Sequence, residues 1–488
     1  MRMPDKRSIA RIGVRAAAVL ATVGLAAAIL AAAALVPWPE HRVAPPSLVV
    51  QPAESRQQRV CPGPLLTLAD DAAEATTASS IGSASAVTAV EPDGATVDET
   101  PIEAPGNPDA DADGTPTTIS TEAGDVDAGM LAGAQSQTAS TETLAGFAAA
   151  ACAEALAETW LVAGASDLGR TALVLLANPT AVSATVDVRV IGESGPVEAP
   201  SALGIIVPAG TQRVLSLAGL APNLRSPVVH VTSTGGAVAA TIEHSVVLGL
   251  APAGVELTGA AAAPATSQVI PGFRVTQDGG VDPADDHAEG DDFPAVRLFA
   301  PGDAPVDVSI GVVPESGSGG STIDVTLQPG RVSDVPLGSL DAGLYTIRLE
   351  GDGEFVTAAR ATTGIPGELS PDTGEAEASV DLAWSVATMP LLEDAIVAIP
   401  RGPSPTLHLA NTGEEEATAT VTIGGDAREM TVPAGGSVSM QLDADAPTLL
   451  AGVGGLYGAV SYAGDGELAS FPVQPPGPLD SPIEVFPL

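Results

Sequence analysis

Three stretches of the chain repeat the same order of strands and turns, and this repetition constrains the fold more than any other feature. The first match is a strand with a polar turn: Val174-Leu-Leu-Ala-Asn-Pro-Thr180, Arg297-Leu-Phe-Ala-Pro-Gly-Asp303 and Leu407-His-Leu-Ala-Asn-Thr-Gly413. The second match is a turn: Val207-Pro-Ala-Gly210, Leu327-Gln-Pro-Gly330 and Val432-Pro-Ala-Gly435. The anchors at 174, 297 and 407 are 123 and 110 residues apart, so each repeat has the size of a domain.

The repeats predict an all-β fold built from tandem Ig-like β-sandwich modules. About 110 residues, roughly seven short alternating strands and frequent turns are typical of such a sandwich. Tyr345 follows a Gly-Leu pair at the start of a strand, and Tyr457 does the same, so both are candidates for a structural tyrosine corner. We place the modules at residues 146–263, 264–370 and 371–488.

The N-terminus has the pattern of a membrane anchor. A basic head over residues 1–15 precedes 21 uncharged residues, 16–36, which are long enough to span a hydrocarbon core of about 30 Å. The positive-inside rule keeps the head in the cytoplasm and exports everything after Val36. We expect a single-pass protein of the cell membrane with an uncleaved signal anchor. A signal peptide cleaved in the alanine-rich stretch is the alternative.

The segment between the anchor and the modules holds both cysteines, Cys61 and Cys152. An even pair in an exported chain favours one disulfide, and two unpaired thiols are the alternative. Residues 37–68 form an extracellular segment with a Cys-Pro strand. Residues 69–145 are rich in Ala, Thr, Ser and acidic side chains, a composition that predicts a disordered linker, because such a segment alone has too little apolar surface to fold.

The charges argue against several functions. A net charge of −41 repels nucleic acid, so we expect no nucleic-acid partner. No spacing typical of zinc ligands, phosphate loops or catalytic serines occurs, so we predict no catalytic, cofactor-binding or metal-binding residue.

The five histidines, His41, His230, His244, His287 and His408, are isolated and are expected to be structural, with His230 and His408 facing outward and His244 half-buried.

An acidic insertion over residues 278–292 holds seven carboxylates and one histidine. It follows no fixed ligand spacing, so a solvated loop is the main interpretation. A calcium site at the tip of the loop is the alternative, because hard oxygen ligands cluster there.

The layout resembles a known family. The Cys-Pro strand, the acidic linker, the second cysteine, Trp-Leu-Val-Ala-Gly at 160–164, Leu-Ala-Asn-Pro at 176–179 and Val-Pro-Ala-Gly at 207–210 look like the actinobacterial family named domain of unknown function 5719. The resemblance covers roughly residues 45–488. It implies a large secreted or membrane-anchored protein of the cell envelope and transfers no catalytic residue.

The sequence therefore predicts a non-enzymatic extracellular envelope protein whose Ig-like modules act as a structural or protein-binding scaffold. The alternative is an accessory module that binds envelope glycan or supports its processing. The small number of aromatic residues, thirteen in all, argues against the glycan alternative, because sugars are usually stacked on exposed aromatic rings.

Overall fold

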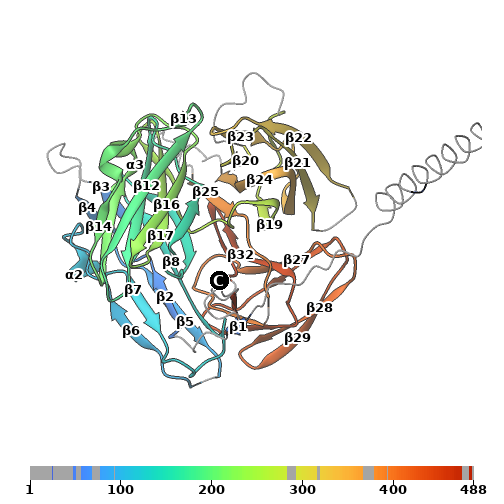
Figure 1. The fold of residues 1–488 in the computed structure, drawn as a ribbon, viewed down its shortest axis with the longest axis horizontal. Coiled ribbons are helices and arrows are strands. Elements are labelled where there is room, and N and C mark those ends of the chain that lie inside the picture. The colour runs from blue at the N-terminus through green and yellow to red at the C-terminus, as the bar shows by residue number, and fades with distance from the viewer. Residues whose placement is uncertain are drawn as a thin grey trace, which may run out of the picture. The chain divides into compact units, whose positions relative to one another are not determined.

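The structure is a computed structural model that describes residues 25, 48–50, 56–68, 77–92, 94–282, 293–315, 319–365, 379–392, 394–474 and 483–485. The chain divides into two units, Met1–Gln51 with Pro482–Leu488, and Pro52–Ser481. In the first unit, β1 (Leu48–Val50) pairs antiparallel with β34 (Ile483–Val485). The remaining described strands belong to the second unit and follow one another along the colour scale of Figure 1.

The first repeat contains eight main strands in two antiparallel sheets. The elements are β10 (Glu158–Leu161), β11 (Arg170–Asn178), β12 (Ala184–Gly192), β13 (Gly195–Pro196), η1 (Pro200–Ala202), β14 (Ile205–Val207), β15 (Thr211–Ser216), α3 (Leu217–Leu220), β16 (Val228–Gly235), β17 (Ala239–Leu248) and β18 (Ala251–Thr258). One sheet has the order β10-β16-β12, with β13 and β14 beside β12, and the other has the order β15-β11-β17-β18. We leave out the two-residue β13 and number the other strands in chain order, so that β10 is the first strand and β18 is the eighth.

The third repeat has the same strand order. Its elements are β26 (Ala395–Val397), β27 (Thr406–Asn411), β28 (Ala417–Ile423), β29 (Asp426–Val432), β30 (Ser437–Gln441), β31 (Thr448–Ala451), β32 (Leu456–Gly464) and β33 (Glu467–Pro472). Its sheets are β26-β31-β28-β29 and β30-β27-β32-β33. The first strand again lies beside the sixth, and the second beside the seventh, so the two repeats share one topology.

The second repeat follows this topology with two strands fused into one. Its elements are β19 (Ala265–Val275), β20 (Ala295–Phe299), β21 (Val306–Pro314), β22 (Ser321–Leu327), β23 (Val332–Pro336), β24 (Gly343–Ile365) and β25 (Ser379–Val386). β24 pairs with β21 up to Gly351 and with β20 from Val356 onward, so it serves as both the sixth and the seventh strand. β25 pairs with β24 and is the eighth strand, so the expected boundary at residue 370 separates a strand from its own sheet.

The expected disordered linker is wrong for residues 77–92 and 94–145, which fold into most of a fourth repeat. The elements of this N-terminal repeat are β2 (Gln58–Cys61), β3 (Leu66–Leu68), β4 (Ala78–Ser80), β5 (Ser85–Val90), β6 (Asp98–Pro101), α2 (Ala110–Asp113), β7 (Thr117–Ser120), β8 (Leu131–Ser140) and β9 (Ala145–Ala151). The sheet β2-β7-β6 corresponds to the first, sixth and third strands of the common topology. The sheet β5-β8-β9 corresponds to the second, seventh and eighth strands, and β3 pairs with β4. The fourth and fifth strands of the common topology have no counterpart among the described residues.

The N-terminal repeat folds because it shares its core with its neighbours. Phe147 and Ala149 of β9 pack with the core of the third repeat. Leu65 and Leu66 pack with Leu173 of the first repeat. The small side chains of residues 69–145 provide little apolar surface of their own, and the prediction of disorder failed because it assumed that the segment stands alone.

Turn residues explain why the repeated motifs fold alike. Asn178 and Asn411 end the second strand of their repeats. Each side-chain amide donates to one backbone carbonyl in the following loop and to another at the end of the fourth strand. Each side-chain oxygen also accepts a backbone N–H two residues onward, from Thr180 and from Gly413. Such Asx bonds fix the turn, so the Leu-Ala-Asn motif marks equivalent positions in these two repeats.

The second strands of the first, second and third repeats are buried on both faces over most of their length, whereas β5 of the N-terminal repeat is largely exposed. In β11, Val174 and Leu176 point into the core of the first repeat, and Leu173 and Leu175 point into a cluster shared with the N-terminal repeat. In β12, by contrast, Val186 and Val188 are buried while Thr185 is exposed. Continuous apolar runs thus identify the strands that face a neighbouring repeat, and alternating runs identify those with a solvated face.

The eighth strands of the four repeats pack together. β18 contacts β9 and β25, and β33 contacts the same two strands, so the contacts run from the N-terminal repeat through the first, second and third and back to the N-terminal repeat. The four repeats therefore form a closed series within Pro52–Ser481.

The expected membrane anchor at residues 16–36 lies outside the described residues, apart from Leu25. Among the residues that the structure describes, no helix is both long and apolar enough to cross a membrane.

Candidate functional site

Cys61 and Cys152 form a disulfide. Cys61 ends β2, and Cys152 follows β9, so the bond joins the first and eighth strands of the N-terminal repeat. Backbone hydrogen bonds in both directions between Val60 and Ala153 lie next to it. The disulfide therefore closes a folded repeat, where we had expected it to close a disordered loop.

The two candidate tyrosine corners occupy different strands. Tyr345 lies at the start of the sixth-strand part of β24, and its hydroxyl donates to the carbonyl of Asp341 at 2.8 Å. Tyr457 lies at the start of β32, a seventh strand, and its hydroxyl has no hydrogen bond within the described part of the chain. The two Gly-Leu-Tyr sequences are therefore not equivalent. The one with Tyr345 begins a sixth strand, and the one with Tyr457 begins a seventh strand.

The histidines in the described region are held by protein partners. His230 stacks on Trp160 with ring centroids 3.9 Å apart, and its Nε2 lies 2.8 Å from Glu158. His408 was expected to face outward, but it is fully buried, because Gly272 of the second repeat packs against its ring. Its two ring nitrogens bond to Glu315 and Ser461.

His244 was expected to be half-buried, and it is buried. His41 and His287 lie outside the described residues.

Most of the acidic insertion, residues 283–292, also lies outside the described residues. At its start, Asp278 accepts the backbone N–H of Ala342 at 2.7 Å, which ties the insertion to the turn before β24. Among the residues that the structure describes, no three His, Cys, Asp or Glu side chains are grouped closely enough to hold a metal ion.

A buried carboxylate, Asp381, joins all four repeats. Its Oδ2 accepts the backbone N–H groups of Phe147 at 2.8 Å and Leu468 at 3.1 Å. Its Oδ1 accepts those of Val255 at 3.1 Å and Leu382 at 3.0 Å. These four residues lie on β9, β33, β18 and β25, so each eighth strand contributes one donor. We call this arrangement the Asp381 hub.

Local backbone geometry makes the hub possible. Gly146 precedes one of the donor residues with a φ of +141°, and a Cβ on it would lie 2.6 Å from Asp381 Oδ1. Glycine therefore allows the carboxylate to approach the strand. Burial raises the pKa of Asp381 well above its usual range, and the four backbone hydrogen bonds act in the opposite direction. Burial and the neighbouring Asp381 charge also raise the pKa of Glu256.

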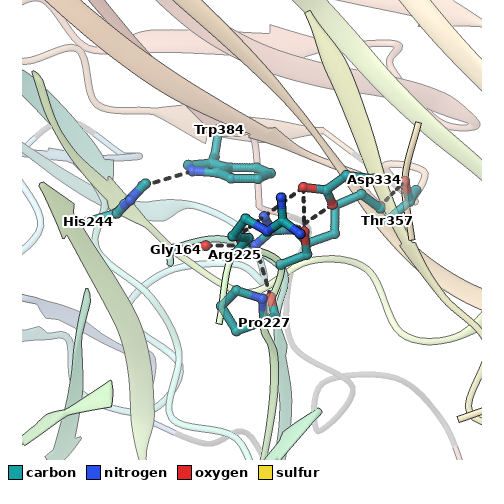
Figure 2. Close-up of polar contacts among 9 residues, drawn as sticks. Gly164, Arg225, Pro227, His244, Asp334, Thr357 and Trp384 are labelled. Carbon is teal, nitrogen blue, oxygen red and sulfur yellow. Dashed lines mark hydrogen bonds and ion pairs between the residues drawn. The ribbon is translucent and has the colours of Figure 1, made fainter. Parts of the chain in front are cut away.

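A buried guanidinium, Arg297 of β20, joins the first and second repeats. Its Nε and Nη2 bind the two carboxylate oxygens of Asp334 at 2.8 and 2.9 Å. Its remaining N–H groups donate to the carbonyls of Gly164, Pro227 and Arg225 in the first repeat (Figure 2). All five donors are thus used, and we call this arrangement the Arg297 joint.

Trp384 and His244 extend the joint. The Arg297 guanidinium lies 4.5 Å from the centre of the Trp384 ring, and the Arg360 guanidinium lies 5.8 Å from the same ring. The indole Nε1 donates to Nδ1 of His244 at 3.3 Å (Figure 2). Burial alone would raise the pKa of Asp334, but the charge and hydrogen bonds of Arg297, with Arg360 and Ser226, lower it.

A cavity of about 180 Å³ borders the Arg297 joint. Charged side chains and two aromatic ring systems line much of it: Asp167, Arg170, Glu193, Arg225, His244, Arg297, Asp334, Arg360 and Trp384. We take this joint cavity as the candidate binding site. A second cavity, of about 250 Å³, lies beside Trp160 and a run of alanines at 260–263 and is mainly apolar.

None of the hub, joint or cavity residues was predicted as functional from the sequence. One signal was present, since Arg297 and Asp381 each interrupt an otherwise apolar strand, Ala295–Phe299 and residues 380–384. A charge in such a run is usually buried with a dedicated partner. The partner residues come from other repeats and could not be identified from spacing.

Comparison with known proteins agrees with the resemblance found in the sequence. Residues 107–448 match the family of unknown function DUF5719, and a search of curated proteins finds no match. The match begins inside the N-terminal repeat and ends in β31 of the third, and it covers more than half of the chain. The protein is therefore a member of the DUF5719 family.

Proposed function

We propose that the protein is a non-enzymatic scaffold whose four repeats act as one unit and present surfaces to a protein partner outside the cell. The Asp381 hub is the observation that carries this proposal. One buried carboxylate binds a strand of every repeat, and buried donors that lose such an acceptor are costly. The repeats are thus held in one arrangement, which suits a protein that keeps binding surfaces at fixed positions.

The bonding of the polar side chains supports this function. Arg297 uses its donors between the first and second repeats, His408 bonds to Glu315 between the third and second, and Ser136 donates to Arg401 between the N-terminal and third. Side chains of types that elsewhere perform catalysis are here engaged in contacts between repeats.

The cellular location is part of the proposal and rests on the N-terminal sequence. The basic head and the apolar stretch favour a cell-membrane protein with residues beyond Val36 outside. Asp465 is exposed in the β32–β33 hairpin, and both native cysteines are bonded, so Asp465→Cys adds a single reactive thiol. We expect an impermeant thiol reagent to label it on intact cells. Lys6→Cys is the matched control and should be labelled only after lysis; the reverse pattern would reject the topology.

The finer assignment of the repeats as Ig-like modules is likewise a proposal. The shared two-sheet order and the hydroxyl bond of Tyr345 support it. The glycan alternative receives less support, because the aromatic side chains of the described residues are buried apart from Tyr457, which is half-buried.

Complementation tests the scaffold against an enzyme. In cells lacking the protein, we expect Val308→Asp to abolish rescue of the envelope defect, because an unpaired charge in the core of the second repeat costs several kcal/mol. Exposed changes such as Asp465→Asn and Arg189→Gln should restore the wild-type phenotype. An exposed polar substitution that erases function while the melting temperature stays constant would contradict the scaffold.

A further inference from the structure

The edge of one sheet in the first repeat carries backbone groups without partners. The arginines that line the joint cavity already have interaction partners, so a ligand finds no free guanidinium there. β15, by contrast, pairs with β11 on one side and is the edge strand of its sheet. An edge strand directs every second residue's N–H and C=O away from the sheet, where they can pair with another strand.

The segment before Pro105 covers one end of this edge. Glu103 donates its N–H to the carbonyl of Gly210 at 2.9 Å, and the N–H of Gln212 donates to the carbonyl of Glu103 at 2.8 Å, as in a parallel pair of strands. The next donor in this pattern would be Pro105, which has no N–H. The chain turns away there, and the N–H of Asn107 bonds to the carbonyl three residues earlier.

The edge is open beyond this point. Gln212 points its N–H outward, and outward-pointing residues alternate along a strand, so Val214 is the next one. Neither the N–H nor the C=O of Val214 has a hydrogen bond within the described part of the chain, and the C=O of Gln212 has none there either. The edge therefore presents an acceptor, a donor and an acceptor in a row, a pattern that the main chain of an extended peptide matches.

A groove of about 460 Å³ lies beside the open edge, and we call it the β15 groove. Its apolar lining includes Leu68, Leu215 and Leu220, and its size lies in the range of ligand pockets. Arg213 is the charged residue of the described lining; its side chain is exposed and has no ion pair within the described residues. A guanidinium in this position favours a ligand that carries a carboxylate.

We propose that the β15 groove binds an extended segment of a partner protein by strand addition, with an acidic side chain of that segment paired to Arg213. The main chain of the segment would accept the N–H of Val214 and donate to the carbonyls of Val214 and Gln212, while its apolar side chains would contact the leucines of the groove. The inference rests on the proposed scaffold function and names the place where its partner docks. A lipid chain would leave the row of backbone groups unsatisfied.

Fluorescence anisotropy of a dye-labelled peptide, Val-Thr-Val-Glu-Val-Thr, titrated with the full chain in detergent tests the proposal. We expect saturable binding. Val214→Pro removes the outward N–H and leaves the β11–β15 hydrogen bonds in place, so it should weaken binding about tenfold or more. Ser439→Pro is the matched control, because Val214 and Ser439 each lie four residues after the glycine of a Val-Pro-Ala-Gly turn and Ser439 is exposed in β30, an edge strand outside the groove. It should bind as the wild type does.

The charge pairing has its own test. Arg213→Gln, at an exposed position, should weaken binding about tenfold, whereas Arg189→Gln, which is exposed outside the groove, should have no effect. A peptide with Gln in place of Glu should bind the wild type as weakly as the original peptide binds Arg213→Gln. It should also lose nothing further on Arg213→Gln, because the pair is already broken.

Several results would overturn the proposal: no saturable binding to the wild type, equal affinities of Val214→Pro and Ser439→Pro, or equal affinities of Arg213→Gln and Arg189→Gln. Residues 69–76 follow Leu68 and lie outside the described residues, so a variant with a Gly-Ser segment of equal length in their place is included. Binding by this variant alone would mean that the chain itself occupies the groove, which also overturns the proposal. Melting curves verify that each variant folds. Complementation tests the scaffold separately, so failure here leaves that proposal standing.

Discussion

The Asp381 hub and the Arg297 joint both bury an ionisable side chain between repeats, but they satisfy its polar atoms in different ways. Asp381 receives four backbone N–H groups, one from each repeat. Arg297 receives one carboxylate and three backbone carbonyls from only two repeats. Within the described residues the hydrogen-bond donors to Asp381 are backbone N–H groups, whereas Arg297 is paired with the carboxylate of Asp334. Loss of Asp381 should therefore affect every repeat, whereas loss of Arg297 should affect one boundary.

The largest expected effect is that of Asp381→Leu. The change leaves four buried N–H groups without an acceptor, and each costs about 1–3 kcal/mol. We expect the free energy of unfolding to fall by more than about 4 kcal/mol, measured by urea denaturation of the full chain.

Asp381→Asn keeps one carbonyl oxygen, so it should lie between Asp381→Leu and the wild type, and it provides a folded variant if Asp381→Leu aggregates. Asp465→Asn is the exposed control. A stability of Asp381→Leu equal to that of wild type would show that the hub does not hold the repeats.

The next effect is that of Arg297→Met, which should cost about 3–5 kcal/mol, because Asp334 is left as a buried charge without its partner. The double variant Arg297→Met with Asp334→Leu should recover part of this loss, since it removes the stranded carboxylate. Urea denaturation of both variants and of the exposed control Arg189→Met measures the difference. A double variant less stable than the single one would mean that Arg297 acts through its backbone contacts and Trp384 rather than through Asp334.

The repeat pattern could be predicted from sequence because it is local. Val-Pro-Ala-Gly turns recur at 207–210 and 432–435, and the glycine of each has the positive φ that the turn requires. The N-terminal repeat was missed because its cores are completed by Leu173 and by the third repeat, far away in the chain. A partial signal existed, since Val60-Cys-Pro-Gly63 resembles Val269-Ile-Pro-Gly272 in β19, the first strand of the second repeat.

The hub and the cavity could not be predicted for a different reason. The donors to Asp381 are backbone N–H groups, which carry no sequence signature. His408 was predicted to face outward because apolar and polar residues alternate along its strand. The second repeat covers that face of the strand, so His408 is buried. The one sequence signal for these sites was a charged residue inside an apolar strand, as at Arg297 and Asp381. Such a residue indicates a buried polar group but does not identify its partner.

A third buried ionisable side chain between repeats, Glu243, provides a pH test of the comparison. Both oxygens of Glu243 contact the single backbone N–H of Leu66, at 3.0 and 3.2 Å. Burial raises the pKa of Glu243 from 4.5 to about 8, and the one hydrogen bond offsets little of this. The folded state thus binds a proton that the unfolded state releases, so this contribution to stability is complete below about pH 4.5 and is lost as the pH rises through about 8.

Glu243→Gln should flatten this dependence, because an amide does not titrate. Unfolding free energies measured at steps between pH 5 and 8 should fall less steeply for the variant, by up to about 1.4 kcal/mol per pH unit. Glu198→Gln, at an exposed position, should retain the slope of the wild type. Parallel curves for Glu243→Gln and wild type would show that Glu243 is ionised throughout this pH range.

The smallest expected effect on stability is that of Tyr345→Phe, which removes a hydrogen bond inside one repeat. Tyr345→Phe removes the hydroxyl that donates to Asp341, a net loss of roughly 1 kcal/mol for one intramolecular hydrogen bond. Tyr457→Phe is the matched control, because the Tyr457 hydroxyl has no partner within the described residues, and we expect its effect on the urea midpoint to be near zero. If Tyr345→Phe cost as much as Arg297→Met, contacts within a repeat would be as important as those between repeats. The distinction between ionisable groups buried between repeats and local bonds within a repeat would then fail.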